Sequence, residues 1–195
     1  MPFTIQLIGI VVIVVSCLFL YILPNWRVLI STLAAIYLVQ FVFIFYLSTP
    51  LLGVVNLIIG WMACAVIGLS IIRMGILENL DQYQSGIAFH LISGFFFILT
   101  AFAISVNAYS WLTKIPYLAF AAGLSLMFTG LLQLNNFQNV IRVVISLLVF
   151  LSGFELIYFS LEISLLVVIL VGMVKLGLAF MGTYLVFVNR LGGKL

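Results

Sequence analysis

Two ionisable residues lie deep inside apolar stretches, and they are the clearest candidates for chemistry in this chain. Glu155 lies in an apolar run over residues 140–160, and Lys175 lies near the middle of a run over 163–189. A charge in hydrocarbon costs several kcal/mol unless it pairs, faces water or is neutralised. If the two runs form a helical hairpin, the residues are offset by about 10 Å along its axis. This offset disfavours a direct pair, and two roles stay open: stations on a proton or ion path, or charges satisfied by neighbouring helices.

Few other polar residues interrupt the apolar stretches. His90 lies about one turn into the run over 87–107, where we expect a hydrogen-bonded histidine near the membrane surface, with a proton relay as the alternative. Gln40, Asn56 and Gln133 are expected to form hydrogen bonds between helices. A single His cannot supply two haem ligands, and no spacing of His, Cys or acidic residues predicts a metal site. We therefore expect no catalysis by the chain alone and no cofactor other than structural lipids.

The composition indicates that this chain lies in a lipid bilayer rather than in water. Of its 195 residues, 67% are hydrophobic and 6% are charged, whereas a soluble domain is about 45–50% apolar and about 25% charged. Soluble and nucleic-acid-binding classes are therefore excluded. Runs this apolar must form helices, because lipid offers the backbone no other hydrogen-bond partners. We predict an all-α membrane protein with one polytopic domain over 1–195 and about seven transmembrane helices, over residues 3–23, 28–47, 51–72, 87–107, 115–134, 140–160 and 163–189.

The cations between these spans predict the orientation. With seven crossings, one side of the membrane carries only Lys114. The side of the C-terminus carries five cations, namely Arg27, Arg73, Arg142, Arg190 and Lys194. By the positive-inside rule, the N-terminus lies outside and the C-terminus lies in the cytoplasm or its organellar equivalent.

The polar segment over residues 73–85 is the longest stretch outside the spans. It contains Arg73, Glu78 and Asp81. A segment of this length is too short to fold by itself, so we expect these three residues to form a surface turn or to contact a soluble or peripheral partner.

Three glycines mark the last expected span, Gly172, Gly177 and Gly182. Steps of five residues advance about 500° around a helix, so the three do not share one face. We expect them to allow close approach by more than one neighbour. With Lys175 among them, the span is expected to be enclosed by protein rather than lipid.

A short motif connects the fifth and sixth expected spans. Gly130-Leu131-Leu132 is followed by a polar turn and then by Asn139-Val140-Ile141-Arg142. This motif resembles component E subunits of group-4 membrane-bound hydrogenases, whose last three spans resemble subunit K of respiratory complex I. The resemblance implies a four-helix part over 1–107 and a three-helix, subunit K-like part over 115–190.

The chain departs from this family at the acidic positions. Subunit K-like proteins carry a carboxylate in the middle of each of the last two helices, where this chain has Leu148 or Leu151 and then Met173. The acidic relay is therefore not carried over. Either the path runs through Lys175, or it is lost and the chain is a scaffold.

These observations together predict a membrane subunit. We expect a non-catalytic integral subunit of a multi-subunit, redox-driven proton- or ion-translocating complex, complex I-like or membrane-hydrogenase-like, that helps to build or seal the ion path. Its partners would be other integral membrane subunits and the lipid of the cell (inner) membrane or an equivalent energy-transducing membrane, with no nucleic acid. The alternatives are a stand-alone seven-helix transporter and a structural or assembly subunit of another membrane complex.

Overall fold

The computed structural model describes residues 3–23, 25–74, 87–109, 116–136, 139–161 and 164–192, and within these ranges the chain is all-α. The helices are α1 (Phe3–Ile22), α2 (Trp26–Leu47), α3 (Pro50–Met74), α4 (Ile87–Tyr109), α5 (Tyr117–Asn136), α6 (Val140–Leu161) and α7 (Leu165–Gly192). Six of them, α2 to α7, are long and apolar enough to cross a membrane, and α1 has a shorter apolar stretch over Gln6–Ile22. The prediction of a helical, multi-pass membrane protein is thereby confirmed.

Local signals explain where the helices begin and end. Pro50 is the first residue of α3, a position at which the missing N–H removes no intrahelical hydrogen bond. At the start of α6, the Asn139 side-chain oxygen accepts a hydrogen bond of 3.1 Å from the backbone N–H of Ile141, as a helix N-cap does. At the end of α2, the N–H of Ser48 donates to the carbonyl of Ile44 at 2.8 Å. Most observed ends fall within two residues of the predicted ones.

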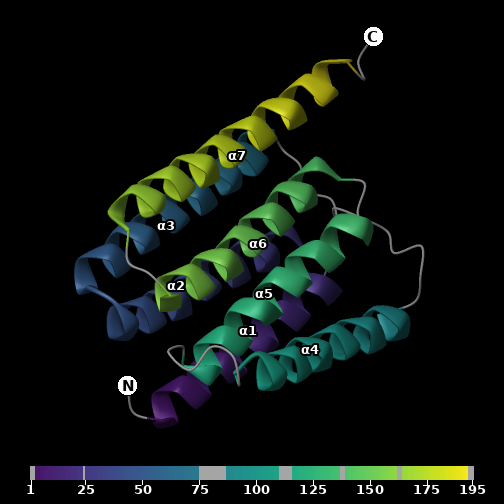
Figure 1. Cartoon of the computed structure of the whole chain (residues 1–195). Helices are drawn as coiled ribbons and strands as arrows, with labels where there is room; N and C mark the ends of the chain where they lie inside the picture. The colour runs from purple at the N-terminus through teal and green to yellow at the C-terminus, as the bar shows by residue number, and fades with distance from the viewer. Residues whose placement is uncertain are drawn as a thin grey trace.

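The helices form two rows of three, with α4 at the side (Figure 1). One row holds α1, α2 and α3, and the other holds α5, α6 and α7. Across the rows, α1 packs on α5, α2 on α6 and α3 on α7, while α4 covers α1 and α5. Helix α1 begins at one end of the bundle, called here the N-terminal face, and α7 ends at the opposite C-terminal face (Figure 1). The three helices over 115–190 thus each pack on one of the first three helices of the part over 1–107.

Helices α5 and α6 approach each other closely through their backbones. A Cβ built on Gly153 would lie 2.5 Å from the carbonyl oxygen of Gly123, and one on Gly130 would lie 2.8 Å from the backbone N of Phe150. Small residues that let two backbones touch are the usual basis of helix association in lipid. Because Gly123 and Gly130 are seven residues apart, they share one face of α5. The seven-residue spacing could have predicted this close contact, but the sequence analysis considered only the glycines of the last span.

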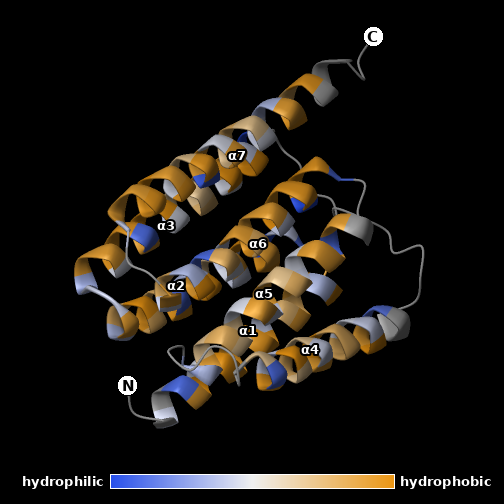
Figure 2. Cartoon of the chain, in the orientation of Figure 1, coloured by the Kyte–Doolittle hydropathy of each residue, from blue (hydrophilic) through white to orange (hydrophobic). Residues whose placement is uncertain are grey.

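Helix α7 is covered by this chain on one side only, so the chain alone does not provide the expected enclosure by protein. Gly172 faces Ile59 of α3 and Gly182 faces Val144 of α6, with hypothetical Cβ atoms 2.7 and 2.5 Å from those side chains. A Cβ on Gly177 would meet nothing within 4 Å. The opposite face of α7 is apolar and exposed (Figure 2), including Leu166, Ile169, Leu170, Met173, Phe180, Met181 and Tyr184. Two of the three glycines therefore allow close approach by two different helices, and the remaining surface suits lipid or another membrane protein.

Candidate intramembrane charge site

Lys175 and Glu155 form a direct ion pair in the interior of the bundle. The ammonium of Lys175 donates a hydrogen bond to Oε2 of Glu155, and the two residues are 0% and 3% exposed. The prediction that their offset disfavours a direct pair is therefore wrong.

The direction of helical side chains explains the error. Side chains lean toward the N-terminus of their own helix. Helix α6 runs toward the N-terminal face and α7 runs away from it (Figure 1). Glu155 consequently leans away from that face and Lys175 leans toward it. The two long side chains close the backbone offset from both directions.

Two amide side chains from the opposite row complete this site. The Gln40 amide nitrogen, on α2, donates to Oε2 of Glu155 at 2.9 Å and to the carbonyl of Ser152 at 3.2 Å. On α3, the Asn56 side-chain oxygen accepts a hydrogen bond of 3.0 Å from Lys175 Nζ. Gln40 is 0% and Asn56 2% exposed, so the expectation that these amides bond between helices is confirmed. The charge site defined by Lys175, Glu155, Gln40 and Asn56 thus connects α2, α3, α6 and α7.

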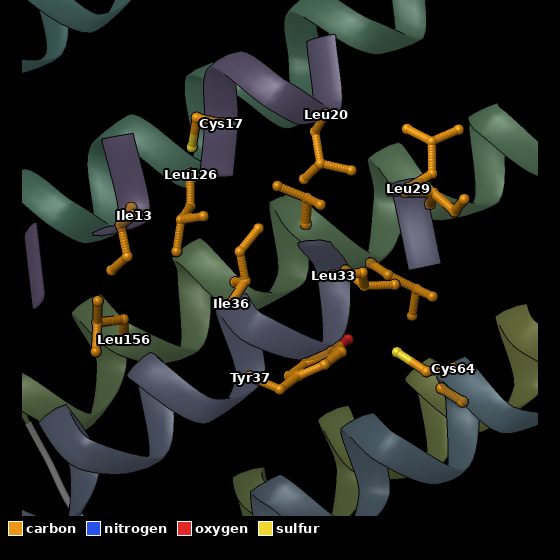
Figure 3. Packing of buried hydrophobic residues seen from close by; sticks show 14 of the residues in the cluster. Ile13, Cys17, Leu20, Leu29, Leu33, Ile36, Tyr37, Cys64, Leu126 and Leu156 are labelled. Carbon is orange, nitrogen blue, oxygen red and sulfur yellow. The ribbon is translucent and has the colours of Figure 1, made fainter. Parts of the chain in front are cut away.

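An aromatic ring covers the ammonium. Lys175 Nζ lies 4.8 Å from the centroid of the Tyr37 ring, within the range of a cation–π contact. The ring lies against Gly60, where a Cβ would come within 2.5 Å of it. Cys64 is also buried, and its sulfur and the Tyr37 hydroxyl point toward one another (Figure 3). A glycine on α3 thus makes room for the ring that α2 places over the charge.

The members of the charge site lie at similar depth. Gln40 is seven residues before the end of α2, Asn56 is six after the start of α3, and Glu155 is six before the end of α6. At about 1.5 Å per residue, all three lie about 10 Å inside the N-terminal face. Lys175, ten residues into α7, lies about 15 Å inside it. The expected span ends already place Gln40, Asn56 and Glu155 at a common level, and sequence reasoning did not compare these three residues.

A separate apolar layer closes the charge site toward the N-terminal face. It consists of one buried residue from each of the same four helices, Ile44, Leu52, Phe159 and Val168. Each is 0–5% exposed. On the other side, the main core continues with buried residues such as Leu33 and Cys64 (Figure 3). The paired charges are therefore enclosed between two apolar layers.

His90 belongs to a different part of the bundle. It lies in the first turn of α4, is 3% exposed, and its ring centroid is 5.2 Å from that of Tyr21 on α1. The Tyr21 hydroxyl in turn shares a hydrogen bond of 3.0 Å with Ser93 Oγ. Helix α4 packs on α1 and α5, so His90 lies against the C-terminal end of α1 and away from the charge site.

Arg142 is also buried, although it was counted among the cations between spans. The residue is 2% exposed, and its guanidinium donates through Nη2 to the carbonyl of Leu23 at 3.0 Å. Its own carbonyl accepts from Ser146 Oγ at 2.6 Å, and that hydroxyl lies 3.3 Å from Gln133 Oε1. Gln133 therefore contacts a neighbouring helix as expected. Arg142 ties the end of α1 to the start of α6.

Of the predicted partner-contact residues, Arg73 lies near the end of α3 and is exposed. Glu78 and Asp81 lie outside the described residues. Within the described part of the chain, no three His, Cys, Asp or Glu side chains gather where they could hold a metal ion.

Comparison with known proteins gives no family for this chain. No protein-family model matches it, and no curated protein and no solved structure matches it either.

Proposed function

We propose that this chain is a non-catalytic integral membrane subunit of a redox-driven, ion-translocating complex, in which it builds and seals the membrane part. The observation that carries the proposal is the enclosed Lys175–Glu155 pair, which is shared by four helices. Charges inside a membrane mark ion-handling or assembly functions. The motif resemblance to component E and subunit K supplies the class of complex.

The surroundings of the pair favour sealing over conduction. A conducting station needs water or a proton acceptor on each side. Here Ile44, Leu52, Phe159 and Val168 form an apolar layer toward the N-terminal face. The ammonium is held by a carboxylate, an amide oxygen and an aromatic ring. In this function the pair clamps two rows of helices, and the apolar layers block ion leakage past them.

A stand-alone transporter is the second candidate, and the helix geometry argues against it. Carriers bind their substrates near the midplane at discontinuous helices, whose unwound backbone supplies ligands. The four helices around the charge site are continuous past Gln40, Asn56, Glu155 and Lys175. Their polar side chains form hydrogen bonds with one another.

The proposed topology has seven crossings, with α1 as the first, the N-terminus outside and the C-terminus in the cytoplasm. The start of α1 and the end of α7 at opposite faces of the bundle support an odd number of crossings (Figure 1). The test uses single cysteines placed near Lys194 and near Lys114, because the native Cys17 and Cys64 are both buried. A membrane-impermeant thiol reagent should label the first site only from the cytoplasm and the second only from outside. Labelling of both sites from one face would contradict seven crossings.

Gentle purification from native membranes tests the proposed function itself. A tag on the chain should isolate, in mild detergent, a complex whose other subunits carry flavin, iron–sulfur or metal centres, visible by native mass spectrometry and absorption spectroscopy. A discrete oligomer of this chain alone would favour the transporter. A stable complex without redox centres would favour a structural subunit of another kind.

A further inference from the structure

A groove runs along the outer surface between α3 and α7 near the C-terminal face. Its volume is about 450 Å³, and it is lined by Val66, Leu69, Ser70 and Arg73 of α3 and by Phe187 of α7. From Val66 to Arg73 it extends about 10 Å along α3. Its inner part is apolar, and a cation stands at its outer end.

Arg73 is placed where a membrane surface would lie. It is the last residue but one of α3, and its side chain is exposed. Among the described residues, no hydrogen bond or ion pair engages its guanidinium. A second exposed arginine at this face, Arg27, instead lies over the ring of Trp26, with its Cζ 5.3 Å from the ring centroid. Arg73 therefore has an apolar groove beside it, whereas Arg27 has an aromatic partner of its own chain.

We propose that this groove is a binding site for one anionic phospholipid, which bridges α3 and α7. The guanidinium of Arg73 pairs with the headgroup phosphate, because its planar fork matches phosphate oxygens in a bidentate manner. An acyl chain lies along Val66, Leu69 and Phe187, where the groove enters the apolar region. Basic pockets between transmembrane helices are a recognised mode of anionic lipid binding. This inference does not depend on the proposed function.

Titration of the detergent-purified, delipidated full chain with phosphatidylglycerol, followed by native mass spectrometry, tests this site. Phosphatidylcholine is the comparison lipid, because it carries the phosphate without a net charge. We expect tighter binding of phosphatidylglycerol, and about tenfold weaker binding by Arg73→Gln, which corresponds to the loss of one charge-assisted contact. Leu69→Trp, which fills the groove and leaves Arg73 in place, should also weaken binding.

Arg27→Gln is the matched control, since it removes the same charge from the same face outside the groove. It should leave the affinity for phosphatidylglycerol unchanged. Equal affinity in Arg73→Gln and the wild type would overturn the proposal. An equal loss in Arg27→Gln would also overturn it, because it would indicate general attraction to a basic surface. Equal affinity for phosphatidylglycerol and phosphatidylcholine would show that the lipid's charge plays no part and would also overturn the proposal.

Discussion

Breaking the charge site from one side should destabilise the protein far more than removing both charges. In Lys175→Met, the carboxylate of Glu155 loses its ammonium and keeps the hydrogen bond from Gln40, while the Asn56 oxygen loses its donor. Removing one partner of a buried pair costs about 3–5 kcal/mol. A single hydrogen bond between membrane helices contributes about 0.6 kcal/mol on average. The loss of charge pairing, rather than the amide contacts, should therefore dominate.

The double variant Glu155→Gln/Lys175→Met removes both charges and retains an amide near Gln40. Replacing both members of a buried pair is often close to neutral, so we expect its stability to lie within about 2 kcal/mol of the wild type. Each single variant should be destabilised by about 3–5 kcal/mol. The coupling energy of the cycle should consequently be several kcal/mol in favour of the pair.

The chain supplies its own unfolding reporter. Cys17 lies on α1, away from the charge site, and is 1% exposed. A thiol-reactive fluorophore should reach it only on unfolding. Measurements in a Cys64→Ala background remove the second thiol, which adjoins the site. Single variants as stable as the wild type, or single losses that simply add in the double variant, would refute the reasoning.

Two further predictions about packing can be checked with the same unfolding assay. Gly153→Ala should destabilise the protein by about 1–3 kcal/mol, since its Cβ would lie 2.5 Å from the Gly123 carbonyl oxygen. Gly177→Ala, whose Cβ would meet nothing within 4 Å, should leave the stability unchanged or raise it by up to about 1 kcal/mol. A larger loss of stability in Gly177→Ala than in Gly153→Ala would show that the α5–α6 contact is not close. Phe159→Ala should cost about 3–5 kcal/mol, because Phe159 is 3% exposed in the apolar layer, and a loss below about 1 kcal/mol would mean that this layer is loosely packed.

The sequence predicted the helices well because the physical signal is strong. Apolar runs bounded by proline and polar turns leave the backbone a single choice in lipid, and Pro50 and Asn139 lie at observed helix starts. The type of partner for Gln40 and Asn56 was also predictable, since a buried amide must bond across helices.

The pairing of Lys175 with Glu155 was not predicted, because depth alone was compared. Each side chain leans toward the N-terminus of its own helix, and this lean closes the backbone offset that a comparison of depths alone leaves open. The extent to which this chain itself covers α7 was also not predictable from one buried charge. One buried charge requires a single protein-facing side, and the rest of the helix can remain exposed, as Met173 is.

We propose that the charge site clamps and seals the bundle rather than carrying protons. The most direct test is the number of ions pumped per electron by membrane vesicles that contain the assembled Glu155→Gln/Lys175→Met complex. Neither substituted side chain can exchange a proton near neutral pH, so a relay would fail, whereas a clamp would persist. We expect the same number of ions per electron as in the wild type. A fully assembled variant complex that transfers electrons but pumps clearly fewer ions would contradict the claim.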